Sequence, residues 1–313
     1  MGHDQLFKLL LQAFFADFVG LFAPDAAAAL DWSTLTFRDA EMFTDLPQGE
    51  RRAADLVAQA YTLGGLRRLI LLHVEVQRRR QAHFPLRMWQ YYAALRLRED
   101  LPVLPIALLL YPAEQGLSLA TYEEEVLGQT YLTFRYLQIS APLLSAEEYV
   151  GAATPLGAGL AAVMRPATRG RAGRIALHRA CLRRIREAVE AGQVDEARAF
   201  LLVNMVATYL SLSPAEEQRL RAQMSKEGDT TMEATELTWA DRILLRGREE
   251  GPRAGREEGQ RAGQRATIRE AALARFGSVP PSLEQRLAAA TDDQELRALI
   301  RLVSTAATPA DLT

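Results

Sequence analysis

The residue that this sequence has least of is cysteine, because Cys181 is the only one in 313 residues. A single cysteine cannot build a disulfide framework or a cysteine-based metal site within the chain. The formal net charge is only −2, so the composition gives no overall signal for nucleic-acid binding, and any basic surface must come from local clusters. The cysteine content fits a reducing compartment, and we expect a cytoplasmic protein.

Several well-known sequence motifs are also missing. The sequence has no phosphate-binding glycine loop after a strand, no Gly-x-Ser-x-Gly elbow and no His-Glu-x-x-His helix. The apolar stretch at 6–22 is interrupted by Lys8, Gln12 and Asp17, and no basic leader or small-residue cleavage site accompanies it. We therefore expect a buried helix there, with neither a signal peptide nor a membrane span.

The first 140 residues alternate between helix and strand patterns. Helix formers and β-branched or aromatic runs follow one another in the order α-β-β-β-α-β-β, which predicts an α/β fold with a mixed sheet flanked by helices. The predicted helices are 4–20 and 83–99, and the predicted strands are 30–38, 53–61, 69–77, 103–111 and 131–139.

The strand at 69–77 carries the main chemical signal. Its last five residues alternate strictly, so His73, Glu75 and Gln77 share one face. Paired glycines at 64 and 65 indicate a hairpin with the preceding strand. If the hairpin is centred on position 65, Asp55 lies directly opposite Glu75, whereas a shift of one residue would place them on opposite faces.

Two opposed carboxylates destabilise a sheet unless a cation lies between them. Mg²⁺ is commonly held by one or two carboxylates together with water and phosphate oxygens. The simpler alternative is that Asp55 and Glu75 point to solvent. The pattern alone leaves both interpretations open.

The rest of the chain reads as helical. We divide it into a core at 1–145, a helical extension at 146–246, a glycine, arginine and glutamate repeat at 247–266, and a small helical module at 267–313. Glycine recurs every fourth residue from 247 to 263, which favours a solvated linker with partial helicity. The alternative is a small-residue helix face that forms a homo-oligomer.

Four short motifs and a C-terminal segment occur in a recognisable order. They are His3-Asp-Gln-Leu-Phe-Lys8, Arg52-Ala-Ala-Asp-Leu-Val57, His73-Val-Glu-Val-Gln77, Arg87-Met-x-x-Tyr91, and Ala274-Arg-Phe-Gly277 with Pro280-Pro281. Together they resemble the PD-(D/E)XK nuclease superfamily, and more narrowly the recombination-promoting nuclease/putative transposase family with its small C-terminal domain of unknown function. The resemblance covers nearly the whole chain.

The resemblance implies a PD-(D/E)XK nuclease-like fold and metal-dependent hydrolysis of DNA. In that family pattern Asp55, Glu75 and the backbone carbonyl of Val76 hold Mg²⁺ (or Mn²⁺), and the metal activates a water. The superfamily usually has lysine where this chain has Gln77. Glutamine can orient the water as the third catalytic residue, but it brings no positive charge.

Other residues are weaker candidates. Arg78, Arg79 and Arg80 follow the glutamate strand and could hold phosphate, although a charge run is usually a solvated surface. For Arg87 and Tyr91 we expect either a nucleic-acid contact, or support for Gln77, or simple packing. Asp4 and Lys8 are either an ordinary pair one helical turn apart or accessory residues beside the metal. A structural role is expected for His73.

These expectations lead to a Mg²⁺-dependent endodeoxyribonuclease with DNA as its partner. The main alternative is a non-catalytic DNA-binding protein that retains the fold. A third hypothesis is an oligomeric interaction protein built on the repeat at 247–263.

Overall fold

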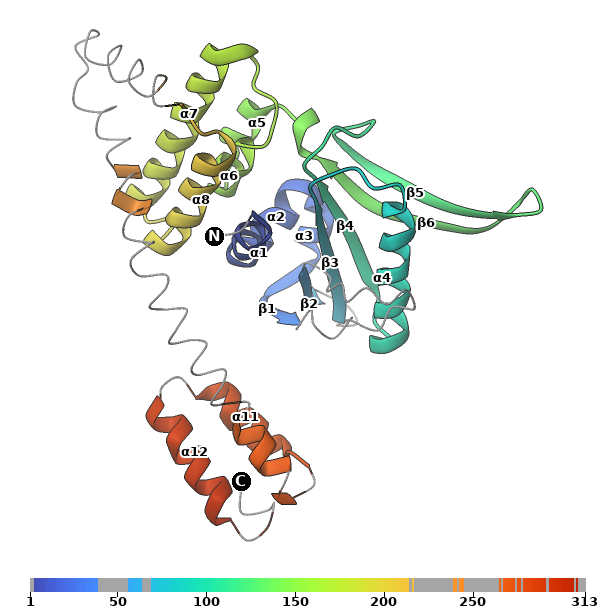
Figure 1. The fold of residues 1–313 in the computed structure, drawn as a ribbon, viewed down its shortest axis with the longest axis vertical. Helices are drawn as coiled ribbons and strands as arrows, with labels where there is room; N and C mark the ends of the chain where they lie inside the picture. Colours follow the sequence, from blue (N-terminus) through green and yellow to red (C-terminus); the bar gives the residue numbers. More distant parts are fainter. Residues whose placement is uncertain are drawn as a thin grey trace. The chain divides into compact units, whose positions relative to one another are not determined.

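The chain forms two compact units, Met1–Leu244 and Leu245–Thr313, each with an apolar core of its own (Figure 1). The computed structural model describes residues 3–38, 56–63, 69–213, 216, 239–240, 242–244, 265, 267–273, 275–276, 278–290, 293–306 and 308. The glycine repeat at 247–263 lies outside these residues.

A mixed sheet organises the first unit, as the sequence predicts, but it has six strands where five were expected. Its order is β1-β2-β3-β4-β6-β5. β3 pairs in parallel with β4, and β4 with β6, whereas the other neighbours are antiparallel. The strands are β1 (Leu30–Arg38), β2 (Leu56–Thr62), β3 (Leu69–Gln77), β4 (Val103–Leu109), β5 (Leu117–Val126) and β6 (Gln129–Ser140).

The β2–β3 ladder has the register that a hairpin centred on position 65 requires. Leu56 pairs with Val74, Val57 with His73, and so on to Tyr61 with Leu69. Asp55, however, lies outside the described residues. Its position opposite Glu75 therefore stays a prediction.

Helices cover both faces of the sheet. On one face the strand residues Leu72 and Val74 pack into a large core with α1 (His3–Ala13), α2 (Phe15–Phe22) and the helices that follow the sheet. On the other face lies α4 (Phe84–Glu99), whose Leu95 packs against Val57 and Leu71. Figure 1 shows α4 on the side of the sheet opposite to α1 and α2. Glu75 thus faces α4 because it alternates with Val74.

The single helix expected at 4–20 is wrong. α1 ends at Ala13 and α2 begins at Phe15, with an 86° bend between them. The bend brings the apolar sides of both helices into one core, where Phe7 and Phe18 are buried. Among the described residues, no single helix has the length and apolar composition to cross a membrane, and these two reach them only as a bent pair.

Strand β5 was missed by the sequence analysis. Most of its residues are exposed, and it ends in Glu123, Glu124 and Glu125, so it lacks the apolar run of a buried strand. It pairs only with β6, and the two form a long hairpin that extends beyond α4 (Figure 1). The hairpin turns at Leu127 and Gly128, which both have positive φ (53° and 78°).

The remaining helices of the first unit pack on the α1 face. Their helical structure agrees with the expectation that the chain after the sheet is helical. This group comprises α3 (Pro24–Ala28), α5 (Ala146–Val150), α6 (Leu156–Ala161), α7 (Gly170–Glu190) and α8 (Glu196–Tyr209).

The second unit is a small helical module. α11 (Pro281–Ala289) and α12 (Asp293–Thr305) pack with helical residues between 265 and 276 around Leu283, Leu287 and Leu296. Arg269 donates two hydrogen bonds to the carboxylate of Glu284, at 2.7 and 2.9 Å.

Candidate functional site

The polar residues of β3 form a buried row beneath α4. The exposed fractions of His73, Glu75 and Gln77 are 0%, 6% and 7%. β3 has a neighbouring strand on each side, so these side chains lie over the middle of the sheet. The alternative in which Glu75 points to solvent is therefore wrong.

A buried carboxylate needs compensation, and Arg87 of α4 supplies it. Its Nη2 donates to Glu75 Oε1 at 3.2 Å and also to Gln77 Oε1, and its Nη1 donates to Gln81 Oε1 at 2.6 Å. The guanidinium also lies over the ring of Phe84, 5.1 Å from its centre. Arg87 is thus held on several sides and supports the β3 row.

The amide of Gln77 is fixed at both ends. Its Oε1 accepts from Arg87, and its Nε2 donates to the carbonyl of Arg79 at 2.7 Å. This arrangement leaves one amide hydrogen and one lone pair of Oε1 for any further partner.

His73 is the deepest residue of the row. Among the described residues, neither ring nitrogen has a hydrogen-bond partner, and Nε2 lies 3.7 Å from Glu75 Oε2. The edge of the imidazole meets the ring of Tyr91, with centroids 5.3 Å apart and planes at 79°. The burial of this pair supports the structural role expected for His73.

Some candidates take a different role from the one that the sequence indicated. Tyr91 is only 2% exposed and packs against His73, which favours the packing alternative over a nucleic-acid contact. Arg87 is similarly occupied within the protein, with a side chain that is 13% exposed. Lys8 is exposed on α1, the helix that packs on the face opposite to Glu75, and the side chain of Asp4 is outside the described part of the structure.

The arginines that follow β3 are at the surface. Arg78, Arg79 and Arg80 are all exposed, and Arg80 donates to the carbonyl of Pro112 at 3.4 Å. They lie at the carboxyl end of β3, directly after the polar row. Their position makes them accessible to a large anionic ligand.

A groove of about 610 Å³ adjoins these arginines. Its lining includes Arg80, Gln81 and Phe84, and also Tyr111 and Tyr136. Burial raises the pKa of Tyr136 to about 12, and Tyr111 adds to the rise. Burial also raises the pKa of Tyr111, although Arg80 and Arg87 oppose the change. Both hydroxyls are therefore protonated near neutral pH and can donate hydrogen bonds.

Sequence reasoning did not find this groove. Its lining comes from α4, β4, β5, β6 and the loops between them, and no local pattern connects those segments. The only available signal was Tyr111 at the end of a predicted buried strand.

Two of the three predicted metal ligands, Glu75 and the Val76 carbonyl, lie in the described part of β3. Leu71 N–H donates a hydrogen bond to the carbonyl of Pro102, and Leu110 N–H donates one to the carbonyl of Gln77. The backbone N–H and C=O groups of odd-numbered residues in β3 therefore point toward β4. The Val76 carbonyl therefore faces the β2 side, where Asp55 is expected. Among the described residues, no three His, Cys, Asp or Glu side chains form a group that could hold a metal ion.

The donor chemistry of this partial site still fits a hard cation. Glu75 and the Val76 carbonyl offer oxygen, which Mg²⁺ and Mn²⁺ prefer. The third predicted ligand, Asp55, lies outside the described residues.

Comparison with known proteins adds no relative. No protein-family model matches the chain, and neither does any curated protein or solved structure.

Proposed function

We propose that this protein is a metal-dependent endodeoxyribonuclease with a PD-(D/E)XK nuclease-like core. The observation that carries the proposal is the buried Glu75-x-Gln77 pair on the central strand, held by Arg87 beside an exposed arginine run. Burying a carboxylate is costly, and such costs are typically tolerated at functional sites. The mixed sheet and the β2–β3 register support the same proposal.

Asp55, Glu75 and the Val76 carbonyl would hold Mg²⁺ or Mn²⁺. When bound, the ion would polarise the scissile phosphate and lower the pKa of a coordinated water. The protein's own residues would position the substrate, with Arg78, Arg79 and Arg80 binding phosphates at the carboxyl end of β3.

Arg87 compensates for the lysine that the superfamily usually has at the position of Gln77. Its guanidinium is hydrogen-bonded to Gln77 itself and so brings a positive charge to the same end of the row. A charge held there before the reaction stabilises developing negative charge on the phosphate without further reorganisation. Gln77 would then act in two ways, by fixing Arg87 through Oε1 and by orienting a water through its remaining amide hydrogen.

Nicking of supercoiled plasmid in the presence of Mg²⁺ tests the proposal. We expect Glu75→Gln and Asp55→Asn each to reduce nicking by at least about a hundredfold, because each removes a metal ligand. Glu124→Gln, at an exposed carboxylate of β5, is the matched control and should nick normally. Unchanged nicking by Asp55→Asn, with the folded state confirmed by circular dichroism, would overturn the metal assignment.

A second candidate function is non-catalytic DNA binding by the same fold. The observation that favours it is that Glu75 already has a cationic partner within the chain, the guanidinium of Arg87. In this case DNA binding would depend strongly on salt but would be the same in EDTA, in Mg²⁺ and after Glu75→Gln. Binding that strengthens with Mg²⁺ and weakens after Glu75→Gln would favour the nuclease.

A further inference from the structure

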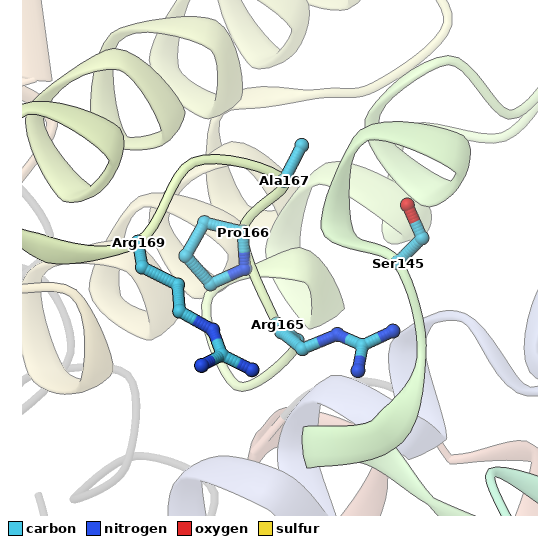
Figure 2. A pocket seen from close by; sticks show the side chains of 5 residues that line it. All are labelled: Ser145, Arg165, Pro166, Ala167 and Arg169. Carbon is cyan, nitrogen blue, oxygen red and sulfur yellow. The ribbon is translucent and has the colours of Figure 1, made fainter.

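A small pocket lies where the loop after α6 turns into α7. Its volume is about 240 Å³, and it is lined by Ser145, Arg165, Pro166, Ala167 and Arg169. Figure 2 shows the Arg169 side chain running toward Arg165 and the Arg165 side chain running on toward the segment that carries Ser145, whereas the Ser145 hydroxyl points away from both guanidinium groups. The chemistry of the pocket is therefore that of two guanidinium groups.

The backbone that carries these arginines is fixed. Arg165 N–H donates to the carbonyl of Leu144 at 3.0 Å, and its own carbonyl accepts from Ala146 N–H at 2.9 Å. Ala167 N–H donates to both carboxylate oxygens of Glu147, at 2.9 and 3.0 Å. The loop is thus attached to the start of α5 at two points, which orders it before any ligand binds.

Close packing against α7 fixes the other end of the loop. A Cβ at Gly173 would lie 1.7 Å from the carbonyl oxygen of Thr168, so only glycine lets the loop lie so close to the helix. Gly170 has a φ of +86°, which is the left-handed region that favours glycine. These two glycines allow the turn that places Arg169 beside Arg165.

The two arginines differ from their neighbours in having no partner. Arg171 bonds Glu216 at 2.8 Å and Arg174 bonds the carbonyl of Ser211 at 2.7 Å. Across the described residues, by contrast, neither Arg165 nor Arg169 has a side-chain hydrogen bond or an ion pair, and both are exposed. The nearby carboxylate of Glu147 accepts hydrogen bonds from Ala167 N–H at both oxygens and, within the described residues, forms no ion pair with either arginine.

Their charges also oppose the dipole of α7. Arg169 precedes the 21-residue helix, Arg171 lies in its first turn, and that turn has no acidic residue. Positive side chains at a helix N-terminus are unfavourable, and an anion bound there would reverse the effect. The arrangement therefore favours a ligand with negative charge.

We propose that this pocket is a second phosphate-binding site, which takes a backbone phosphate of DNA. The sheet provides the reason for DNA as the source. Gln77, Leu109 and Ser140 lie in one row across the parallel strands β3, β4 and β6, and the pocket begins five residues after Ser140. The carboxyl ends of these parallel strands therefore lead both to the arginines after β3 and to the pocket. A DNA backbone that crosses this end of the sheet would meet both. Only the choice of DNA rests on the proposed function.

Fluorescence anisotropy with labelled duplex DNA in EDTA tests the proposal without requiring cleavage. We expect Arg165→Ala/Arg169→Ala to weaken binding about tenfold and to lower the slope of log Kd against log salt by about one, as for one lost phosphate contact. Arg165→Lys/Arg169→Lys should lose less DNA affinity, because lysine keeps the positive charge and lacks only the forked N–H donors of the guanidinium group. Arg135→Ala, at an exposed arginine of β6, is the control and should change neither quantity.

Gly173→Ala provides a second test that leaves the charge unchanged. It should weaken DNA binding while a melting curve shows α7 still folded, because the added Cβ pushes the loop away from the helix. Isothermal titration with inorganic phosphate separates the sources of the ligand. Phosphate binding that is lost in the double variant, with DNA binding unchanged, would overturn the assignment to DNA, and no effect on either ligand would overturn the site.

The outcomes remain distinct from those of the nuclease experiment. Loss of nicking in Glu75→Gln, with DNA binding in EDTA unchanged, concerns the nuclease reaction and not the pocket. Reduced binding in the arginine variants supports the pocket even if the protein has no nuclease activity.

Discussion

Arg87 connects Glu75 and Gln77 through one nitrogen, Nη2, which donates to Oε1 of both side chains. The carboxylate and the guanidinium are nearly buried, with side chains 8% and 13% exposed. Breaking a buried ion pair by removing one partner leaves the other charge uncompensated, which commonly costs 3 to 5 kcal/mol. The pair is therefore central to the stability of the site as well as to its proposed chemistry.

The first prediction concerns this pair. Arg87→Met should lower the free energy of unfolding by about 3 kcal/mol, because Glu75 remains buried without its cation. Glu75→Gln/Arg87→Met should recover most of that loss, since both charges are then gone. Urea denaturation of the two variants and of Glu75→Gln completes a double-mutant cycle.

Arg96→Met is the matched control on the same helix. Arg96 lies 3.8 Å from Asp100, which is 98% exposed, so this pair should contribute less than about 1 kcal/mol. If the double variant is no more stable than Arg87→Met alone, the loss comes from packing and the ion pair does not explain it.

Strand β3 was predictable from the sequence because its polar and apolar residues alternate strictly. The paired glycines indicated the hairpin but left its register open, and the β2–β3 ladder agrees with the register centred on position 65. Local periodicity is sufficient for such features because side-chain direction follows directly from backbone geometry.

Features that depend on distant segments were not predictable. The bend after Ala13 comes from the need of two apolar helices to reach one core, and the mainly apolar run at 6–22 gives no sign of it. Most residues of β5 are exposed, and its second half carries three consecutive glutamates, so it lacks the apolar run that marks a buried strand. The pocket of Arg165 and Arg169 depends on hydrogen bonds to the loop before α5.

The second prediction concerns His73. Replacing a buried polar group that has no hydrogen-bond partner by an apolar group of similar size is close to neutral or stabilising. We expect His73→Leu to change the free energy of unfolding by less than about 1 kcal/mol in either direction. Tyr91→Leu, which removes the ring against which His73 packs, should destabilise by about 2 kcal/mol. A loss of more than 2 kcal/mol in His73→Leu would mean that the imidazole has a partner.

The third prediction concerns the reactivity of Cys181. The thiol is fully buried, and burial, with a further contribution from Glu147, raises its pKa to about 12 despite the opposing effect of its own backbone hydrogen bond. A protonated and inaccessible thiol does not react with disulfide reagents. Native protein at pH 8 should show no reaction with Ellman's reagent, whereas protein unfolded in urea should release one equivalent of thiolate product. Rapid labelling of the native protein would contradict the buried position on α7.

The fourth prediction concerns acid sensitivity from His178, which faces the core from α7. Burial lowers its pKa to about 4, from 6.5, and its Nδ1 has no hydrogen-bond partner. Above pH 6.5 the folded and unfolded states are both neutral at this residue, so it has no effect on stability. Between pH 6.5 and 4 the unfolded chain binds a proton that the folded chain does not bind, and stability falls by about 1.4 kcal/mol per pH unit, or roughly 3 kcal/mol in total. Below pH 4 the loss stops growing.

Comparison with His178→Leu isolates this contribution from the other acid-sensitive groups. Urea denaturation at half-unit intervals from pH 7.5 to 4 should show the stability advantage of the variant growing steadily below pH 6.5. Glu216, whose pKa is lowered to about 2 by hydrogen bonds from Ser213 and Arg171, titrates mainly below this interval and affects both proteins alike. Parallel stability curves for the two proteins would show that His178 is protonated in the folded state, and hence that it is not buried as the structure has it.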